Sequence, residues 1–75
     1  MDSKNLKAII KVLELANEET TIGNLKQLMD TDTITTNKAR NGREVIWYMT
    51  ELTNICVYTD TLEELSEAEI EDQLC

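Results

Sequence analysis

The 75-residue sequence contains no histidine, no proline and no phenylalanine, and its only tryptophan is Trp47. Without histidine, the chain lacks the side chain that most often serves as a general base or a metal ligand. Its two cysteines cannot complete a four-ligand zinc site, and neither has a histidine to activate it as a nucleophile. Since a glycine-rich phosphate loop is also missing, we expect a protein that is not an enzyme and that binds no metal and no cofactor.

The sequence also lacks a long apolar run. No stretch approaches the ~20 apolar residues that a membrane-spanning helix needs, and Met1 is followed by Asp2 and Ser3 instead of the apolar region of a signal peptide. Cys56 and Cys75 are too few and too far apart to suggest a disulfide framework, and Cys56 is predicted to be a small buried side chain. We therefore expect a soluble, cytoplasmic protein that does not bind membranes.

Positive charge is missing from the second part of the chain. Residues 1–43 carry all seven lysines and arginines together with six acids, whereas residues 44–75 carry nine acids and no base. The net charge is −8, and its uneven placement indicates two surfaces with different electrostatic preferences. We define the predicted acidic surface as five carboxylates: Glu63, Glu64, Glu67, Glu71 and Asp72.

Two amphipathic helices are predicted in the first 30 residues. Ser3 or Asp2 can cap a first helix that runs to about Asn17, with an apolar arc of roughly 220° at 100° per residue. This arc is wider than one packing face needs, so the helix either sits centrally or forms the seam of a homodimer. Thr20 or Thr21 can cap a second helix, whose apolar residues recur at helical spacing: Ile22, Leu25, Leu28 and Met29.

Two alternatives compete for the middle of the chain. In the first, a long third helix runs from about Thr36 or Asn41 to Thr53 and is followed by a strand at residues 55–58. In the second, Asn41 and Gly42 form the type I′ turn of a hairpin, and the β-branched and aromatic residues after it form a strand. Helical spacing favours the first alternative, because it gathers the apolar residues on one core-facing side: Val45, Tyr48, Met49, Leu52 and Ile55.

The opposite side of this predicted helix carries the tryptophan among charged and polar residues. Tryptophan and arginine are favoured anchors of protein interfaces. We therefore predict that this side binds a protein partner. Its residues are Arg40, Arg43, Trp47, Glu51 and Asn54.

The C-terminal segment has the local signals of a helix start. Ser66 and Glu69 have the spacing of a capping box, and Leu65 and Ile70 have the spacing of a hydrophobic staple. A helix that runs to about Leu74 is therefore predicted, and it carries most of the acidic surface.

From Leu6 to Tyr58, the order of these elements resembles a winged helix-turn-helix domain. The resemblance rests on apolar spacing in four segments: Leu6-x-x-Ile9-Ile10-x-x-Leu13, Thr21-Ile22-x-x-Leu25-x-x-Leu28, Met49-x-x-Leu52 and Ile55-Cys56-Val57-Tyr58. It implies a mainly α fold, in which residues 1–59 form a winged-helix-like three-helix core with a short strand. Residues 60–75 are then an acidic C-terminal helix that is docked on this core or extends from it.

The resemblance also implies a site for DNA, because the third helix of such domains usually enters the major groove. The corresponding residues are Asn37, Lys38, Arg40, Asn41 and Arg43. A net charge of −8 opposes the phosphate neutralisation on which DNA binding depends. We therefore predict a small regulatory module that binds a protein partner, as an inhibitor or adaptor of the kind that viruses encode against nucleic-acid-processing or transcription machines. A DNA-binding transcription regulator is the alternative.

Overall fold

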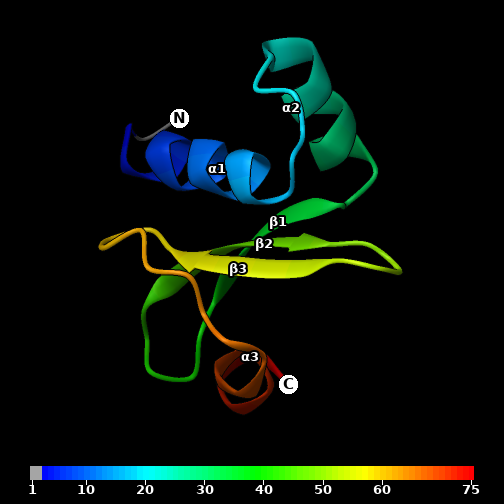
Figure 1. Cartoon of the computed structure of the whole chain (residues 1–75). Coiled ribbons are helices and arrows are strands. Elements are labelled where there is room, and N and C mark those ends of the chain that lie inside the picture. The colour runs from blue at the N-terminus through cyan, green and yellow to red at the C-terminus, as the bar shows by residue number, and fades with distance from the viewer. Residues whose placement is uncertain (1–2) are drawn as a thin grey trace.

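A computed structural model describes residues 3–75 as a three-stranded sheet with helices on both sides (Figure 1). The elements in chain order are α1 (Ser3–Leu15), α2 (Ile22–Asp30), β1 (Ile34–Lys38), β2 (Glu44–Met49), β3 (Asn54–Tyr58) and α3 (Glu67–Leu74). The strands are antiparallel in the order β1-β2-β3. Helices α1 and α2 lie on one side of the sheet, and α3 lies on the other (Figure 1). The sheet thus separates two layers of helix.

The predicted mainly α fold, with a three-helix core and a short strand, is wrong. Residues 36–53, which were predicted to contain the third helix, form most of β1, a hairpin turn, β2 and the next turn, so the arrangement is α+β. The β-branched and aromatic residues of β2 favour a strand. Since helices cover both faces of the sheet, both faces of β2 are apolar, and the alternation typical of a half-exposed strand does not appear in its sequence.

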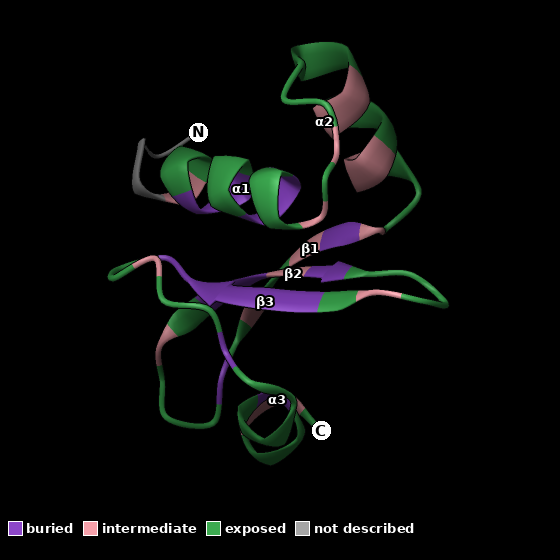
Figure 2. Cartoon of the chain, in the orientation of Figure 1, coloured by how far each residue is buried: buried purple, intermediate pink, exposed green. Residues whose placement is uncertain are grey.

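Two apolar clusters fill the spaces between the layers (Figure 2). Successive side chains of a strand point to opposite faces, so Ile46 belongs to the first cluster and Val45 to the second. The first cluster lies against α1 and comprises Ala8, Ile9, Val12, Leu13, Ile34, Ile46, Tyr48, Ile55 and Val57. The second lies against α3 and comprises Ala39, Val45, Cys56, Tyr58, Leu65 and Ile70.

The side chains that were predicted to form one apolar helix face are therefore dispersed. Val45 lies in the second cluster, whereas Tyr48 and Ile55 lie in the first. Met49 is exposed, and Leu52 is 97% exposed in the turn between β2 and β3. The physical reason is the change from helical to strand geometry, which leaves the end of this segment in a turn.

The two helices that were predicted from capping residues and apolar spacing in the first 30 residues are confirmed. The side chain of Thr21 caps α2 by accepting a hydrogen bond from the backbone N–H of Asn24 at 3.2 Å. Helix α1 ends at Leu15, close to the predicted end, and Asn17 adopts the left-handed conformation with φ of 60°. The predicted cap at Asp2 or Ser3 falls outside the residues whose side chains are described. The predicted strand at residues 55–58 is confirmed as β3.

The turn between β1 and β2 contains Asn41 and Gly42, as in the hairpin alternative, but with another geometry. The backbone N–H of Gly42 donates to the carbonyl oxygen of Ala39 at 2.9 Å, which places Arg40 and Asn41 at the centre of the turn. Gly42 has a φ of 88°, which glycine adopts at little cost, whereas Asn41 has no positive φ. A type I′ turn requires positive φ at both central residues, so this turn belongs to another type.

The two cysteines provide a simple test of this fold. Cys56 is buried in β3, and burial raises the pKa of its thiol to about 12, whereas Cys75 is exposed. We expect a thiol reagent at mildly alkaline pH to modify Cys75 rapidly and Cys56 only after unfolding, because the thiolate is the reactive form. Mass spectrometry of protein labelled with and without denaturant measures both events. Equally rapid labelling of both cysteines in the folded protein would contradict the burial of Cys56.

Of the helices formed by residues 3–75, none combines the length and the apolar character that crossing a bilayer demands.

Candidate protein-interaction face

All five carboxylates of the acidic surface are exposed, and they lie on α3 or on the segment before it. Within the described part of the chain, the one ion pair joins Arg43 to Asp60. None of the five therefore has a cationic partner among the residues whose side chains are described. Their negative charge is open to another molecule.

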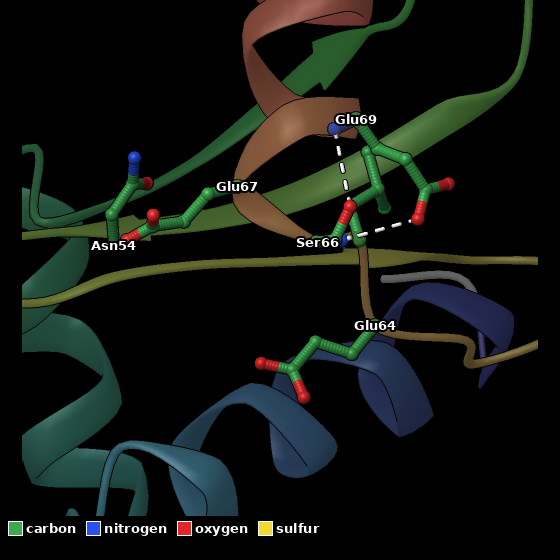
Figure 3. Close-up of a pocket in the computed structure, with 6 residues that line it drawn as sticks. Asn54, Glu64, Ser66, Glu67 and Glu69 are labelled. Carbon is green, nitrogen blue, oxygen red and sulfur yellow. Dashed lines mark hydrogen bonds between the residues drawn. The ribbon is translucent and has the colours of Figure 1, made fainter.

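Two adjoining cavities lie between these carboxylates and the start of β3. The first has a volume of about 510 Å³ and is lined by Asn54, Glu64, Leu65, Ser66, Glu67 and Glu69 (Figure 3). The second has a volume of about 350 Å³ and is lined by Asn54, Glu67, Ile70, Glu71 and Cys75. Since they share Asn54 and Glu67, we refer to them together as the acidic cleft.

Local sequence signals fix the helix that forms one wall of this cleft. The hydroxyl of Ser66 accepts a hydrogen bond from the backbone N–H of Glu69, and the Glu69 carboxylate accepts one from the backbone N–H of Ser66, both at 3.2 Å (Figure 3). This confirms the predicted capping box. Glu67 and Glu69 lie in the first turn, where the helix dipole favours negative charge.

The segment before α3 is held against the edge of β3. The backbone N–H of Leu65 donates to the carbonyl oxygen of Cys56 at 2.8 Å, and Glu64 forms an isolated bridge with Val57. Leu65 and Ile70 are buried in the second cluster. The carboxylates of the cleft are therefore presented by a backbone that is anchored on the sheet.

Trp47 lies at the edge of the acidic cleft. It is half-buried on the sheet face that α3 covers, where it packs against the second cluster. Its indole N–H donates a hydrogen bond to the side-chain oxygen of Asn54, and Asn54 lines both cavities. The structure thus brings together two of the five residues predicted to bind a partner. A third, Glu51, is exposed in the turn that precedes Asn54.

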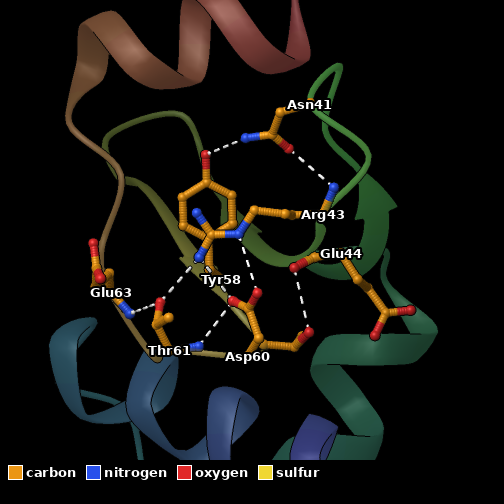
Figure 4. A network of polar contacts seen from close by, with 8 residues as sticks. Asn41, Arg43, Glu44, Tyr58, Asp60, Thr61 and Glu63 are labelled. Carbon is orange, nitrogen blue, oxygen red and sulfur yellow. Dashed lines mark hydrogen bonds and ion pairs between the residues drawn. The ribbon is translucent and has the colours of Figure 1, made fainter.

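Arg43, another of the five residues predicted to bind a partner, forms an ion pair within the chain (Figure 4). Its guanidinium donates to both carboxylate oxygens of Asp60, at 2.8 and 3.1 Å, and lies 3.6 Å from the centroid of the Tyr58 ring. The hydrogen bond to Asp60 raises the pKa of Arg43, and the same bond lowers the pKa of Asp60. Arg43 lies four residues from Trp47, which is about 13 Å along a strand, so the two side chains do not form one site.

Arg40 and Asn41 bind the end of α3. The backbone N–H of Arg40 donates to the carbonyl oxygen of Gln73 at 2.9 Å, and its guanidinium donates to that of Cys75 at 2.6 Å. The backbone N–H of Asn41 donates to the side-chain oxygen of Gln73 at 3.0 Å. The hairpin turn thereby supplies hydrogen-bond donors and a positive charge to a helix C-terminus whose last turn contains no base.

The residues predicted to bind DNA therefore lie on a strand and a turn instead of on a helix. Asn37 and Lys38 belong to β1, and the side-chain amide of Asn37 donates to the hydroxyl of Thr35 at 2.8 Å. Arg40, Asn41 and Arg43 lie in the turn and have the intramolecular partners described above, and the side-chain amide of Asn41 also donates to the hydroxyl of Tyr58 at 3.0 Å. Sequence reasoning missed these contacts of Arg40, Asn41 and Arg43 because their partners are 17 to 35 residues away along the chain.

A second contact that the sequence did not indicate ties β2 to the loop after α1. The hydroxyl of Tyr48 donates to a carboxylate oxygen of Glu18 at 2.6 Å, and this bond, together with burial, raises the pKa of Tyr48 to about 12. Since folding favours the protonated tyrosine, this contribution to stability is present below the unfolded pKa of about 10 and is lost as the pH rises towards 12.

We accordingly expect the wild-type protein to exceed the Tyr48→Phe variant in free energy of unfolding by about 1–2 kcal/mol at neutral pH. The difference is expected to shrink between about pH 10 and 12, as the folded-state pKa requires. Urea denaturation of both proteins over a pH series measures it. A difference that stays constant across this range would contradict the role of the bond to Glu18.

Chemically, the acidic cleft offers carboxylate oxygens beside the apolar side chains of Leu65 and Ile70. It can accept charge-assisted hydrogen bonds from lysine or arginine side chains. In the part of the chain that the structure describes, no three acidic or cysteine side chains are grouped as a metal site requires. No protein-family model, curated protein or solved structure matches this chain.

Proposed function

We propose that this protein is a small, non-catalytic regulatory module that binds a basic surface of a protein partner. The observation that carries the proposal is the acidic cleft, whose exposed carboxylates have no cationic partner among the described residues. Trp47 at its edge supplies a large aromatic side chain of the kind that anchors protein interfaces. A cleft with acidic walls and an aromatic edge suits a partner segment with lysine or arginine side chains.

The chemistry of the cleft also favours a class of partner. Residues 44–75 carry nine acids and no base, so their field steers the module towards positively charged surfaces. Proteins that handle nucleic acids carry such surfaces. We therefore propose an inhibitor or adaptor that acts on a nucleic-acid-processing or transcription machine, in the cytoplasm.

No specific observation favours the alternative of a DNA-binding regulator. Arg40, Asn41 and Arg43, which were predicted to contact bases, form hydrogen bonds within the chain. The excess of acids repels phosphates. We expect no binding to random-sequence duplex DNA at low salt.

The proposal is tested by making the same change of charge at two different places on the molecule. One variant combines Glu64→Lys, Glu67→Lys and Glu71→Lys in the acidic cleft. The matched control combines Glu14→Lys, Glu19→Lys and Asp30→Lys, which are exposed acids of the other layer. Wild-type and variant proteins are immobilised, and the proteins that they retain from cell extract are quantified by mass spectrometry.

We expect at least one protein with a basic surface to be retained by the wild type and by the control variant but not by the cleft variant. Circular dichroism of both variants checks that they remain folded. Equal loss with both variants would show that only the net charge matters. Equal retention by both would show that the cleft does not bind the partner, and either result would refute the proposal.

A further inference from the structure

Helix α3 covers one side of the sheet, and its own sequence stabilises it poorly (Figure 1). It has eight residues, fewer than the roughly 12 to 15 at which an isolated helix becomes even marginally stable in water. Glu67 and Glu71 lie one helical turn apart, where like charges repel each other, and the last turn contains no base that would complement the helix dipole. The helix therefore depends on contacts with the rest of the chain.

These contacts occur along one side of α3 and at its C-terminal end. Ile70 is buried, and Leu74 packs half-buried against the second cluster. At the C-terminal end, three hydrogen bonds come from the turn between β1 and β2. Two run from Arg40 to the carbonyl oxygens of Gln73 and Cys75, and one runs from the backbone N–H of Asn41 to the side chain of Gln73. We refer to these three hydrogen bonds as the latch.

The chain just before α3 is attached to the sheet by different contacts. The backbone N–H of Leu65 donates to the carbonyl oxygen of Cys56, and the backbone N–H of Tyr58 donates to that of Glu63 at 3.0 Å. These hydrogen bonds involve no residue of α3. One end of the helix is thus joined to an anchored segment through Ser66, and the other end is held by the latch.

We propose that α3 is a lid that opens from the sheet as one unit, with the chain at Ser66 as its hinge and the latch holding it closed. Opening breaks the latch and lifts Ile70 and Leu74 from the second cluster. It leaves the three strands paired and the first cluster intact on the other side of the sheet. Short elements with little buried apolar surface open in this way at a lower free energy than the whole domain unfolds.

Opening changes the site, because α3 supplies one wall of the acidic cleft. Glu67 and Glu71 leave the cleft with the helix, whereas Asn54 and Glu64 stay on or beside β3. The cleft is therefore complete only while the lid is closed, and the latch sets the fraction of molecules in that state. This adds regulation to the proposed function, but the lid does not rest on that function, because α3 opens in the free protein with or without a partner.

Hydrogen exchange of the isotope-labelled free protein, followed by NMR, tests the lid. We expect the amides of residues 70–74 to share one protection factor, at least about tenfold below that of the β2 amides paired with β1 and β3. The amides of Arg40 and Asn41 are expected to share the protection factor of α3, although they lie in the β1–β2 turn, because opening releases both from Gln73. Their exchange should also depend less on low urea concentrations than that of β2, because opening exposes less surface than unfolding.

Two variants separate opening of the lid from unfolding of the domain. The latch variant combines Arg40→Ala and Gln73→Ala, which removes two hydrogen bonds of the latch and no carboxylate. We expect it to lower the protection of α3 by at least about fivefold. The matched control is Tyr48→Phe, which removes the bond to Glu18 on the other side of the sheet. It is expected to lower the protection of β2 and to leave that of α3 unchanged, because this bond persists when the lid opens.

Three results would overturn the inference. Protection of α3 equal to that of β2 would show that the helix leaves the sheet only when the whole domain unfolds. Protection that falls gradually from residue 70 to residue 74 would show fraying of the helix end instead of opening as a unit. Equal effects of the latch variant and of Tyr48→Phe on α3 would show that the latch does not hold a separate lid closed.

Discussion

Replacing Leu13 by alanine is expected to lower the free energy of unfolding by about 2–5 kcal/mol. Leu13 is 2% exposed in the cluster between α1 and the sheet, so its loss removes apolar contacts and leaves a cavity. The same replacement at Leu52 is expected to cost less than about 0.5 kcal/mol, because Leu52 is 97% exposed. Urea denaturation of the two variants measures both values.

The stability losses at these two leucines distinguish the observed sheet from the predicted third helix. Helical spacing placed Leu52 in the core beside Val45 and Ile55, and a large loss at Leu52 would follow from that arrangement. In the structure, Leu52 lies in the turn between β2 and β3. A loss of several kcal/mol at Leu52, with little effect at Leu13, would contradict the structure at both positions.

Replacing Trp47 by alanine is expected to weaken binding of the partner by at least about tenfold, since tryptophan anchors of interfaces commonly account for this much binding energy. Its effect on stability is expected to be smaller, about 1 kcal/mol, because the side chain is only half-buried. Titration calorimetry with the partner retained by the wild type measures the first effect, and urea denaturation measures the second.

Ile22→Ala is the control for Trp47→Ala, because Ile22 is an apolar side chain that is 78% exposed on α2, on the other side of the sheet. We expect this variant to change neither binding nor stability appreciably. If Trp47→Ala instead lowers stability strongly and leaves binding intact, Trp47 is part of the second cluster only. The acidic cleft would then lack its aromatic anchor.

The elements that could be predicted are those specified by neighbouring residues. Thr21 and Ser66 cap helices through contacts within three residues, and the apolar spacing of α1 spans only a few turns. The strand β3 could be predicted from its short apolar run. Such signals depend on local geometry, which a sequence records directly.

The strands β1 and β2 could not be predicted with the same reasoning. β2 is covered by helices on both faces, so its apolar run also fits helical spacing. In β1, only Ile34 is buried, and the polar residues after it show no alternation. Pairing with β2 selects the strand, and that pairing depends on residues 6 to 14 positions away.

For the candidate site, the acids were easier to predict than the arginines. The acidic surface follows from the absence of bases after Arg43, which is visible in the sequence. The roles of Arg40 and Arg43 depend on Cys75 and Asp60, which fold back from the C-terminal part of the chain. Their residue types suited a binding site, but tertiary contacts employ them within the molecule.

Hydrogen exchange of the free protein and of its complex with the retained partner tests the central claim most directly. If the partner occupies the acidic cleft, exchange should slow at Asn54 and over residues 63–74, which line it or surround its lining, while β1 stays unchanged. Slowing confined to β1 and residues 39–43, or slowing that random-sequence duplex DNA also produces, would contradict the claim that the cleft binds a protein partner.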